Sequence, residues 1–151
     1  MRRPVVFLAT IAIAASAVLA PASSASAAVP QCTGSGGGLA TMSPPGGPPV
    51  PPGTVYFYPA AANGSSWCWM QRGNHSTAVW ALQWTLNECY FAGIAQDWDF
   101  GPATERALRT AQARSGATVD GGYGPNTRAL LKYISTAGPA YCNQLFLVGI
   151  G

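Results

Sequence analysis

A doubled eight-residue motif constrains the fold of this chain more than any other feature of its sequence. Residues 97–104 (DWDFGPAT) align without gaps with residues 120–127 (DGGYGPNT), 23 positions further on. Both copies carry Asp, an aromatic ring, Gly, Pro and Thr at matching positions. Asp bonds the backbone of its own turn, and Pro suits the first position of a helix. Each copy therefore predicts a tight turn that leads directly into a helix.

Three segments have the apolar spacing of a helix that packs one face against a core. They span residues 76–89, 102–114 and 125–135, and Ser76 or Thr77 is suited to cap the first. The residues expected on their inner faces are Val79, Leu82, Leu86, Cys89, Ala107, Leu108, Ala111, Thr127, Leu130, Leu131 and Ile134. Two turn-helix units are too few for a solenoid. We therefore expect an all-α fold, a compact three-helix bundle.

The N-terminus has the three parts of a secretory signal peptide. Arg2 and Arg3 form a basic start, residues 5–19 are almost uninterruptedly apolar, and residues 25–27 (Ala-Ser-Ala) are a cleavage pattern. A retained membrane anchor is the alternative, but an apolar stretch of about 15 residues is short for a bilayer. We predict that residues 1–27 are removed and that the mature chain is secreted, without a membrane contact.

The charge balance of the mature chain excludes one class of partner. Without Arg2 and Arg3, six Lys and Arg residues remain against five Asp and Glu residues. Nucleic-acid binding needs a concentrated basic face, which this balance does not provide. We therefore expect no nucleic-acid partner.

The four cysteines indicate disulfides, because an even number in a secreted chain is typical of a disulfide framework. Three pairings are open. We favour Cys68–Cys89, because both flank the first predicted helix, with Cys32–Cys142 tying the two tails. A zinc site is the rival interpretation. The chain has no C-x-x-C pair and a single His, His75, so we expect no metal site and no cofactor.

The segment before the helices differs sharply in composition. Residues 33–53 are Gly, Pro and Ser with almost no large apolar side chain, which is typical of a linker or an extended arm. Residues 55–58 are apolar and aromatic, and predict a short strand or a strap. We divide the mature chain into a Pro/Gly-rich linker or arm at 28–66, a folded domain at 67–137, and a C-terminal tail at 138–151 tied by Cys142.

Few residues are available for catalysis. Glycoside hydrolysis needs paired carboxylates, and the acids are Glu88, Asp97, Asp99, Glu105 and Asp120. Two of them, Asp97 and Asp120, are expected to form the repeated turns. A nucleophile assisted by histidine has only His75, and cysteines in disulfides are not nucleophiles. We predict no catalytic residues and no enzyme activity.

The helical part of the chain resembles the peptidoglycan-binding-like domain family, a three-helix module attached to bacterial and phage wall hydrolases. The resemblance covers about 60 residues. The residues that carry it are Leu82, Gln83, Leu86, Asn87, the segment 97–109, Gln112 and the segment 119–127. It implies a compact helical bundle that holds the cell wall without catalysis. One departure is Trp98, where the family has Gly after the Asp. If this position needs positive φ, Trp costs about 1 kcal/mol.

A binding groove is predicted at the two repeated turns. Sugars stack on aromatic faces, the stem peptides of the wall offer carboxylates to Arg, and helix N-termini bind anions. The predicted ligand-binding residues are Trp98, Asp99, Tyr123, Asn126 and Arg128. For Tyr123 a place in the core is the alternative, and for Trp98 a packed position at the rim.

The resemblance implies a secreted, extracellular or wall-associated protein whose partner is peptidoglycan, bound through its glycan or its stem peptide. Two other functions stay open. One is a secreted protein-interaction or inhibitor module, since small disulfide-tied domains often bind proteins. The other is an accessory that targets a separate wall hydrolase.

Overall fold

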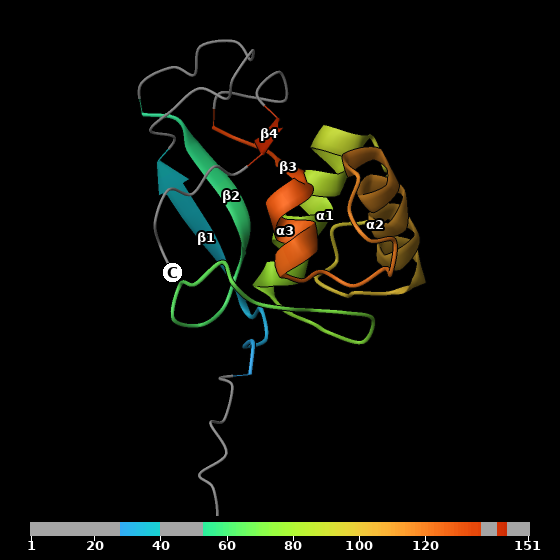
Figure 1. The fold of residues 1–151 in the computed structure, drawn as a ribbon, viewed down its shortest axis with the longest axis horizontal. Helices are drawn as coiled ribbons and strands as arrows, with labels where there is room; N and C mark the ends of the chain where they lie inside the picture. Colours follow the sequence, from blue (N-terminus) through green and yellow to red (C-terminus); the bar gives the residue numbers. More distant parts are fainter. Residues whose placement is uncertain (1–27, 40–52, 137–141, 145–151) are drawn as a thin grey trace, which may run out of the picture.

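The computed structural model describes residues 28–39, 53–136 and 142–144. The predicted signal peptide and most of the C-terminal tail therefore lie outside the described residues. The elements in chain order are β1 (Gly34–Leu39), β2 (Val55–Ala60), α1 (Thr77–Tyr90), α2 (Pro102–Ser115), α3 (Pro125–Leu130), β3 (Lys132–Tyr133) and β4 (Asn143–Gln144). The three predicted helices are confirmed, and the strands around them are few and short (Figure 1).

The helix starts follow the local sequence. Ser76 is the N-cap of α1, and its side chain accepts a hydrogen bond from the Val79 amide at 3.4 Å. Both α2 and α3 begin with Pro after an extended Gly, at Gly101 and Gly124. The end of α3 differs from the prediction. It stops at Leu130, because Leu131 turns to extended backbone and leads into β3.

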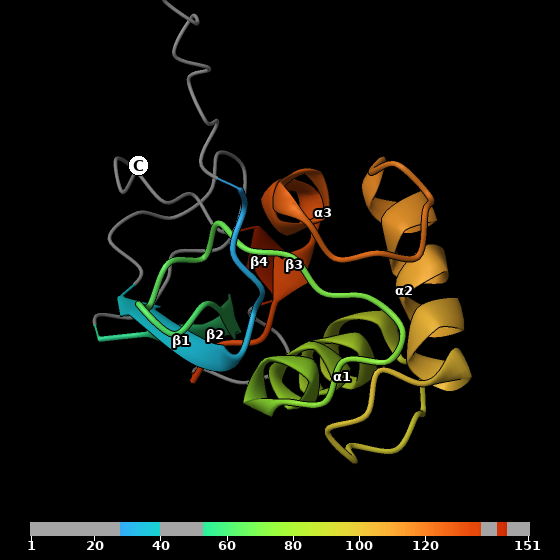
Figure 2. The same cartoon turned by 90° about the horizontal axis from the view of Figure 1, so that it is seen from below.

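A small sheet adds to the helical bundle, which the all-α prediction did not include. Strands β1 and β2 pair antiparallel, from Gly34 opposite Ala60 to Leu39 opposite Val55. Figure 2 shows this sheet on one side of α1 and α2 on the other. Both strands lie within residues 28–66, predicted as a Pro/Gly-rich linker or arm, and β2 includes residues 55–58, for which a short strand or a strap was predicted. Glycine is needed at position 36 of β1, because a Cβ there would come within 2.5 Å of the buried ring of Tyr58.

The predicted disulfide pairing is wrong. The bonds join Cys32 to Cys68 and Cys89 to Cys142, with Cα–Cα distances of 5.1 and 5.6 Å. Cys68 is bonded to Cys32, whose carbonyl accepts from the Ser76 hydroxyl at the start of α1, whereas Cys89 lies in the last turn of this helix of 14 residues, which is roughly 20 Å long. Flanking one helix therefore places two cysteines at opposite ends of it, not side by side.

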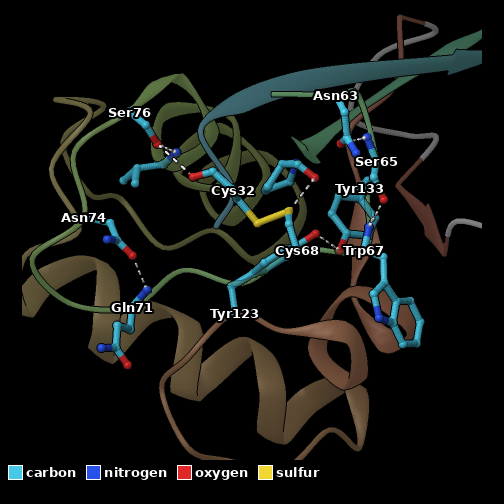
Figure 3. The surroundings of a disulfide bond; sticks show 12 residues. Cys32, Asn63, Ser65, Trp67, Cys68, Gln71, Asn74, Ser76, Tyr123 and Tyr133 are labelled. Atoms are coloured by element: carbon cyan, nitrogen blue, oxygen red, sulfur yellow. Dashed lines mark hydrogen bonds between the residues drawn. A yellow bond between two sulfur atoms is a disulfide. The ribbon is translucent and has the colours of Figure 1, made fainter. Parts of the chain in front are cut away.

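Backbone pairing brings Cys32 to Cys68. The Cys32 amide donates to the Trp69 carbonyl at 2.8 Å, and the Trp69 amide donates to the Pro30 carbonyl at 2.9 Å. Residues 30–32 thus run alongside residues 68–70, and the disulfide closes this contact within the core (Figure 3). At the other end of α1, Cys142 leads into β4, which pairs with β3.

The core lies between the helices and the small sheet. Its largest fully buried side chains include Tyr123, Tyr133, Phe100, Met70, Leu82, Leu86, Leu108 and Leu131. The hydroxyls of Tyr123 and Tyr133 lie 2.8 Å apart, and that of Tyr133 also donates to the Arg128 carbonyl. Burial raises the pKa of both phenols, so they stay neutral in the folded protein. None of the helices in the described ranges has the length and apolarity needed to cross a membrane.

Candidate functional site

The first repeated turn is held by a buried glutamine from α1. The Gln83 amide nitrogen donates to the Asp97 carboxylate at 2.7 Å, the Asp99 carbonyl at 2.9 Å and the Thr104 hydroxyl at 3.1 Å. Its oxygen accepts from the backbone amides of Asp97 and Trp98, both at 3.1 Å. The bond from Gln83 is the main cause that lowers the pKa of Asp97. Asp97 is thus a structural turn residue, as predicted.

The second turn repeats this arrangement with a glutamine from α2. The Gln112 amide nitrogen donates to the Asp120 carboxylate at 2.8 Å, and to the Gly122 carbonyl and the Thr127 hydroxyl at 2.9 Å each. Its oxygen accepts from the Gly121 amide at 2.9 Å. Each turn is therefore clamped by a glutamine from the preceding helix. The sequence repeat thus corresponds to a structural repeat, because the repeated Asp and Thr bond to a buried glutamine in both copies.

The two turns have similar backbone at one matching position but carry different residues there. Trp98 has φ of 66°, and Gly121 occupies the matching position with φ of 74°. The conditional expectation that this position has positive φ is confirmed. Left-handed backbone favours glycine, so Trp98 is a strained residue whose side chain is 45% exposed.

Replacing Trp98 by glycine is expected to raise the free energy of unfolding by about 1 kcal/mol, because the strain of left-handed backbone is removed. Urea unfolding of both proteins measures this. Trp98→Ala is the matched control: it removes the ring and keeps a Cβ, so it gains none of this stability. Equal stability of the glycine and alanine variants would contradict the strain.

Residues 70–75 run between the two turns and bond to both. Met70 and Tyr123 exchange two backbone hydrogen bonds of 2.8 Å. The Gly73 amide donates to the Phe100 carbonyl at 3.0 Å, and the Phe100 amide donates to the Asn74 carbonyl at 2.8 Å. This segment therefore fixes the distance between the two repeated turns.

Two surface hollows flank this segment, and Arg72 lines both. The first, of about 460 Å³, is lined by Gln71, Arg72, Glu105, Asp120, Gly121 and Gly122. The second, of about 340 Å³, is lined by Arg72, Gly73, Asn74, Asp99, Phe100 and Gly101. We call these two hollows and the residues that line them the turn face. The Arg72 side chain is 64% exposed and lies 3.8 Å from Glu105, a loose ion pair at the surface.

The structure separates the five residues predicted to form the groove. Asp99 lines the second hollow, and its carboxylate lies 2.6 Å from the His75 ring. Trp98 precedes it in the chain and is exposed. Tyr123 is 1% exposed, so its ring fills the core and a sugar has no access to it. Its place in the groove was a wrong prediction.

The remaining two predicted residues line neither hollow of the turn face. The Asn126 side chain accepts a hydrogen bond from the Thr118 amide at 3.1 Å and so closes the loop before α3. Arg128 is half-buried, and its Nε has no hydrogen-bond partner in the described part of the chain. Neither residue is placed beside Trp98 by a contact.

The sequence analysis did not predict a role for residues 71–74. Gln71 lines the first hollow, Gly73 and Asn74 line the second, and Arg72 lines both. Their local signal is a turn: Gly73 has φ of 94°, and the Asn74 side chain accepts from the Gln71 amide at 2.7 Å. A turn pattern alone does not say what it faces, because the partners Phe100 and Tyr123 are distant in sequence. Among the described residues no group of three or more His, Cys, Asp and Glu side chains is placed to hold a metal ion.

The geometry defines a small helical module with two hollows beside its clamped turns, lined by charged side chains and glycine backbone. Residues 75–131 match a family model described as "Putative peptidoglycan binding domain". This match spans α1 to α3 with both repeated turns. No curated protein and no solved structure matches the chain. The domain and the two disulfides indicate a location outside the cytoplasm.

Proposed function

We propose that this protein is secreted and binds peptidoglycan without catalysis, with the turn face in contact with the glycan strand. The family match of the three helices is the observation that carries the proposal. The chemistry of the turn face supports it, since Arg72, the acids Asp99, Glu105 and Asp120, and glycine backbone line the two hollows. Sugar rings offer hydroxyl and acetamido groups, which bond to backbone amides, carbonyls and carboxylates.

The exposed side chains beside the hollows suit a sugar. Trp98 precedes Asp99 in the chain and is exposed, and an exposed indole offers a flat apolar face for stacking. The Asp99 carboxylate accepts hydrogen bonds from hydroxyl groups, and such bonds to a charged acceptor are the stronger ones. Arg72 donates from between the hollows. Strain at Trp98 accords with a binding role, since strained residues cluster at ligand sites.

The acids of the chain support binding rather than hydrolysis. Asp97 and Asp120 each hold a turn, Glu105 faces Arg72 and Arg109, and Asp99 faces His75. A glycosidase needs one carboxyl group kept protonated near neutral pH. The hydrogen bond from Gln83 is the main cause that lowers the pKa of Asp97, so this carboxyl group is ionised near neutral pH. Secretion is proposed from the pattern of residues 1–27.

The test is sedimentation of the mature chain with purified peptidoglycan sacculi. Wild type is expected to sediment with the sacculi, and the double variant Trp98→Ala, Arg72→Ala to lose about tenfold in affinity. Lys132→Ala is the matched control, because it removes an exposed charge outside the turn face and is expected to bind like wild type.

Two outcomes contradict the proposal at different levels. If wild type stays in the supernatant, peptidoglycan is not the ligand, and retention on immobilised wall hydrolases or on soluble proteins would point to an interaction module. If the double variant sediments like wild type while its thermal unfolding is unchanged, the wall is the ligand and the turn face is not the contact.

A further inference from the structure

A third hollow, of about 370 Å³, lies between the end of α1 and the outward side of α2. It shares no residue with the turn face. Figure 2 shows the two helices side by side, joined by the loop that follows α1. We call this hollow, with its lining residues Phe91, Ile94, Ala103, Arg106, Ala107 and Arg114, the helix-end hollow.

Phe91 lines this hollow, and both its backbone conformation and its exposure are unfavourable for the stability of the fold. It ends α1 with φ of 57°, a position at which helices usually carry glycine. Its side chain is 84% exposed, the largest fraction among the exposed large apolar residues of the described chain. An apolar ring that is both strained and in water indicates a role outside the fold, since strain of this kind clusters at ligand sites.

The cations of the hollow lack acidic partners in the described part of the chain. Arg72 and Arg109 both pair with Glu105, whereas Arg106 and Arg114 pair with no carboxylate. Arg114 donates to the Tyr90 carbonyl at 3.0 Å, which leaves most of its donors available. The two side chains start eight residues apart on α2, roughly 12 Å along the helix.

The floor between the arginines is apolar and made of small groups. Ala103 and Ala107 lie one helical turn apart on α2, and Ala92 and Ile94 close the hollow from the loop. Methyl groups fit such a floor, while the guanidinium groups at the rim take carboxylates in bidentate hydrogen bonds.

We propose that the helix-end hollow binds a short acidic peptide with small apolar side chains. Peptides of alanine and glutamate have this chemistry, as the stem peptides of peptidoglycan do. The inference thereby rests on the proposed function and adds a second contact, to the peptide rather than to the glycan. Phosphodiester polymers also carry anions, but their polyol units offer no methyl group to the alanine floor.

The test uses the mature chain and the soluble peptide N-acetyl-alanyl-γ-glutamyl-alanine, which carries two carboxylates and two alanine methyls. Titration followed by NMR is expected to shift the signals of Phe91, Arg106 and Arg114. Arg106→Ala is expected to weaken binding about tenfold, and Arg106→Ala with Arg114→Ala to abolish it. Arg72→Ala is the matched control, since it removes a cation from the turn face and leaves binding of the peptide unchanged.

A second variant separates binding from folding. Phe91→Gly removes the strain and the ring, so it is expected to raise the Tm and weaken binding of the peptide. If it raises the Tm and leaves binding unchanged, Phe91 has no part in the site and the proposal is wrong. The proposal is also overturned if the peptide with both carboxylates amidated binds equally well.

Failure of this inference is distinguishable from failure of the proposed function. Wild type that sediments with sacculi but gives no shifts with the peptide retains the proposed function and loses the inference. Shifts at the helix-end hollow with poly(glycerol phosphate), and none with the peptide, overturn the inference in favour of an anionic polymer.

Discussion

Replacing Gln112 by alanine is expected to lower the free energy of unfolding by about 4 kcal/mol, from the loss of a buried hydrogen-bond network. Gln112 is fully buried and serves four groups of the second turn: the Asp120 carboxylate, the Gly122 carbonyl, the Thr127 hydroxyl and the Gly121 amide. Without it, polar groups of a buried turn lose their hydrogen-bond partner, which costs free energy. Urea unfolding followed by tryptophan fluorescence measures the loss.

Gln71→Ala is the matched control, because Gln71 is exposed and no hydrogen bond of its side chain supports a turn. It is expected to change the free energy of unfolding by less than about 0.5 kcal/mol. Gln83→Ala tests whether the first turn is held in the same way, since Gln83 bonds to it as Gln112 bonds to the second. It is expected to lower the free energy of unfolding by as much as Gln112→Ala does. If Gln112→Ala costs no more than Gln71→Ala, the clamp does not hold the turn.

Removing the disulfide of Cys32 and Cys68, by replacing both with alanine, is expected to cost about 4 kcal/mol on the chain-entropy account of cross-links. The bond spans 36 positions, and both residues are fully buried, so the variant also loses packed sulfur atoms from the core. Thermal and urea unfolding under non-reducing conditions measure the change. The bond joins Cys32, which lies just before β1, to the segment before α1. We therefore expect the sheet of β1 and β2 to lose its structure before the helices do.

Cys89→Ala with Cys142→Ala is the companion variant. Its bond spans 53 positions, so the same account predicts a loss of similar size, about 4 kcal/mol. Peptide mapping without reduction checks the pairing directly. A linked peptide that contains Cys68 and Cys89 would contradict the structure, as would a double-alanine variant as stable as wild type.

Local sequence was sufficient for the starts of the three helices and for the repeated turns. Pro after Gly starts α2 and α3, Ser76 caps α1, and the Asp residues bond within their own turns. These effects act over a few residues, so a pattern in the chain is enough to predict them. The positive φ of Trp98 was predictable in the same way, from a glycine at the matching position of the second copy.

Contacts between distant residues needed the tertiary structure. The disulfide pairing depends on which segment lies beside Trp69, and this segment is residues 30–32. Cys68 and Cys89, which were predicted to pair, lie toward opposite ends of α1. Tyr123 has the same aromatic character as an exposed stacking residue, but Met70 and Tyr133 enclose it. The glycine-rich segment pairs with β2, and the Tyr58 ring of that strand packs closely against Gly36. The physical reason is common to all three: burial is decided by what packs from elsewhere in the chain, and a one-dimensional pattern does not contain that partner.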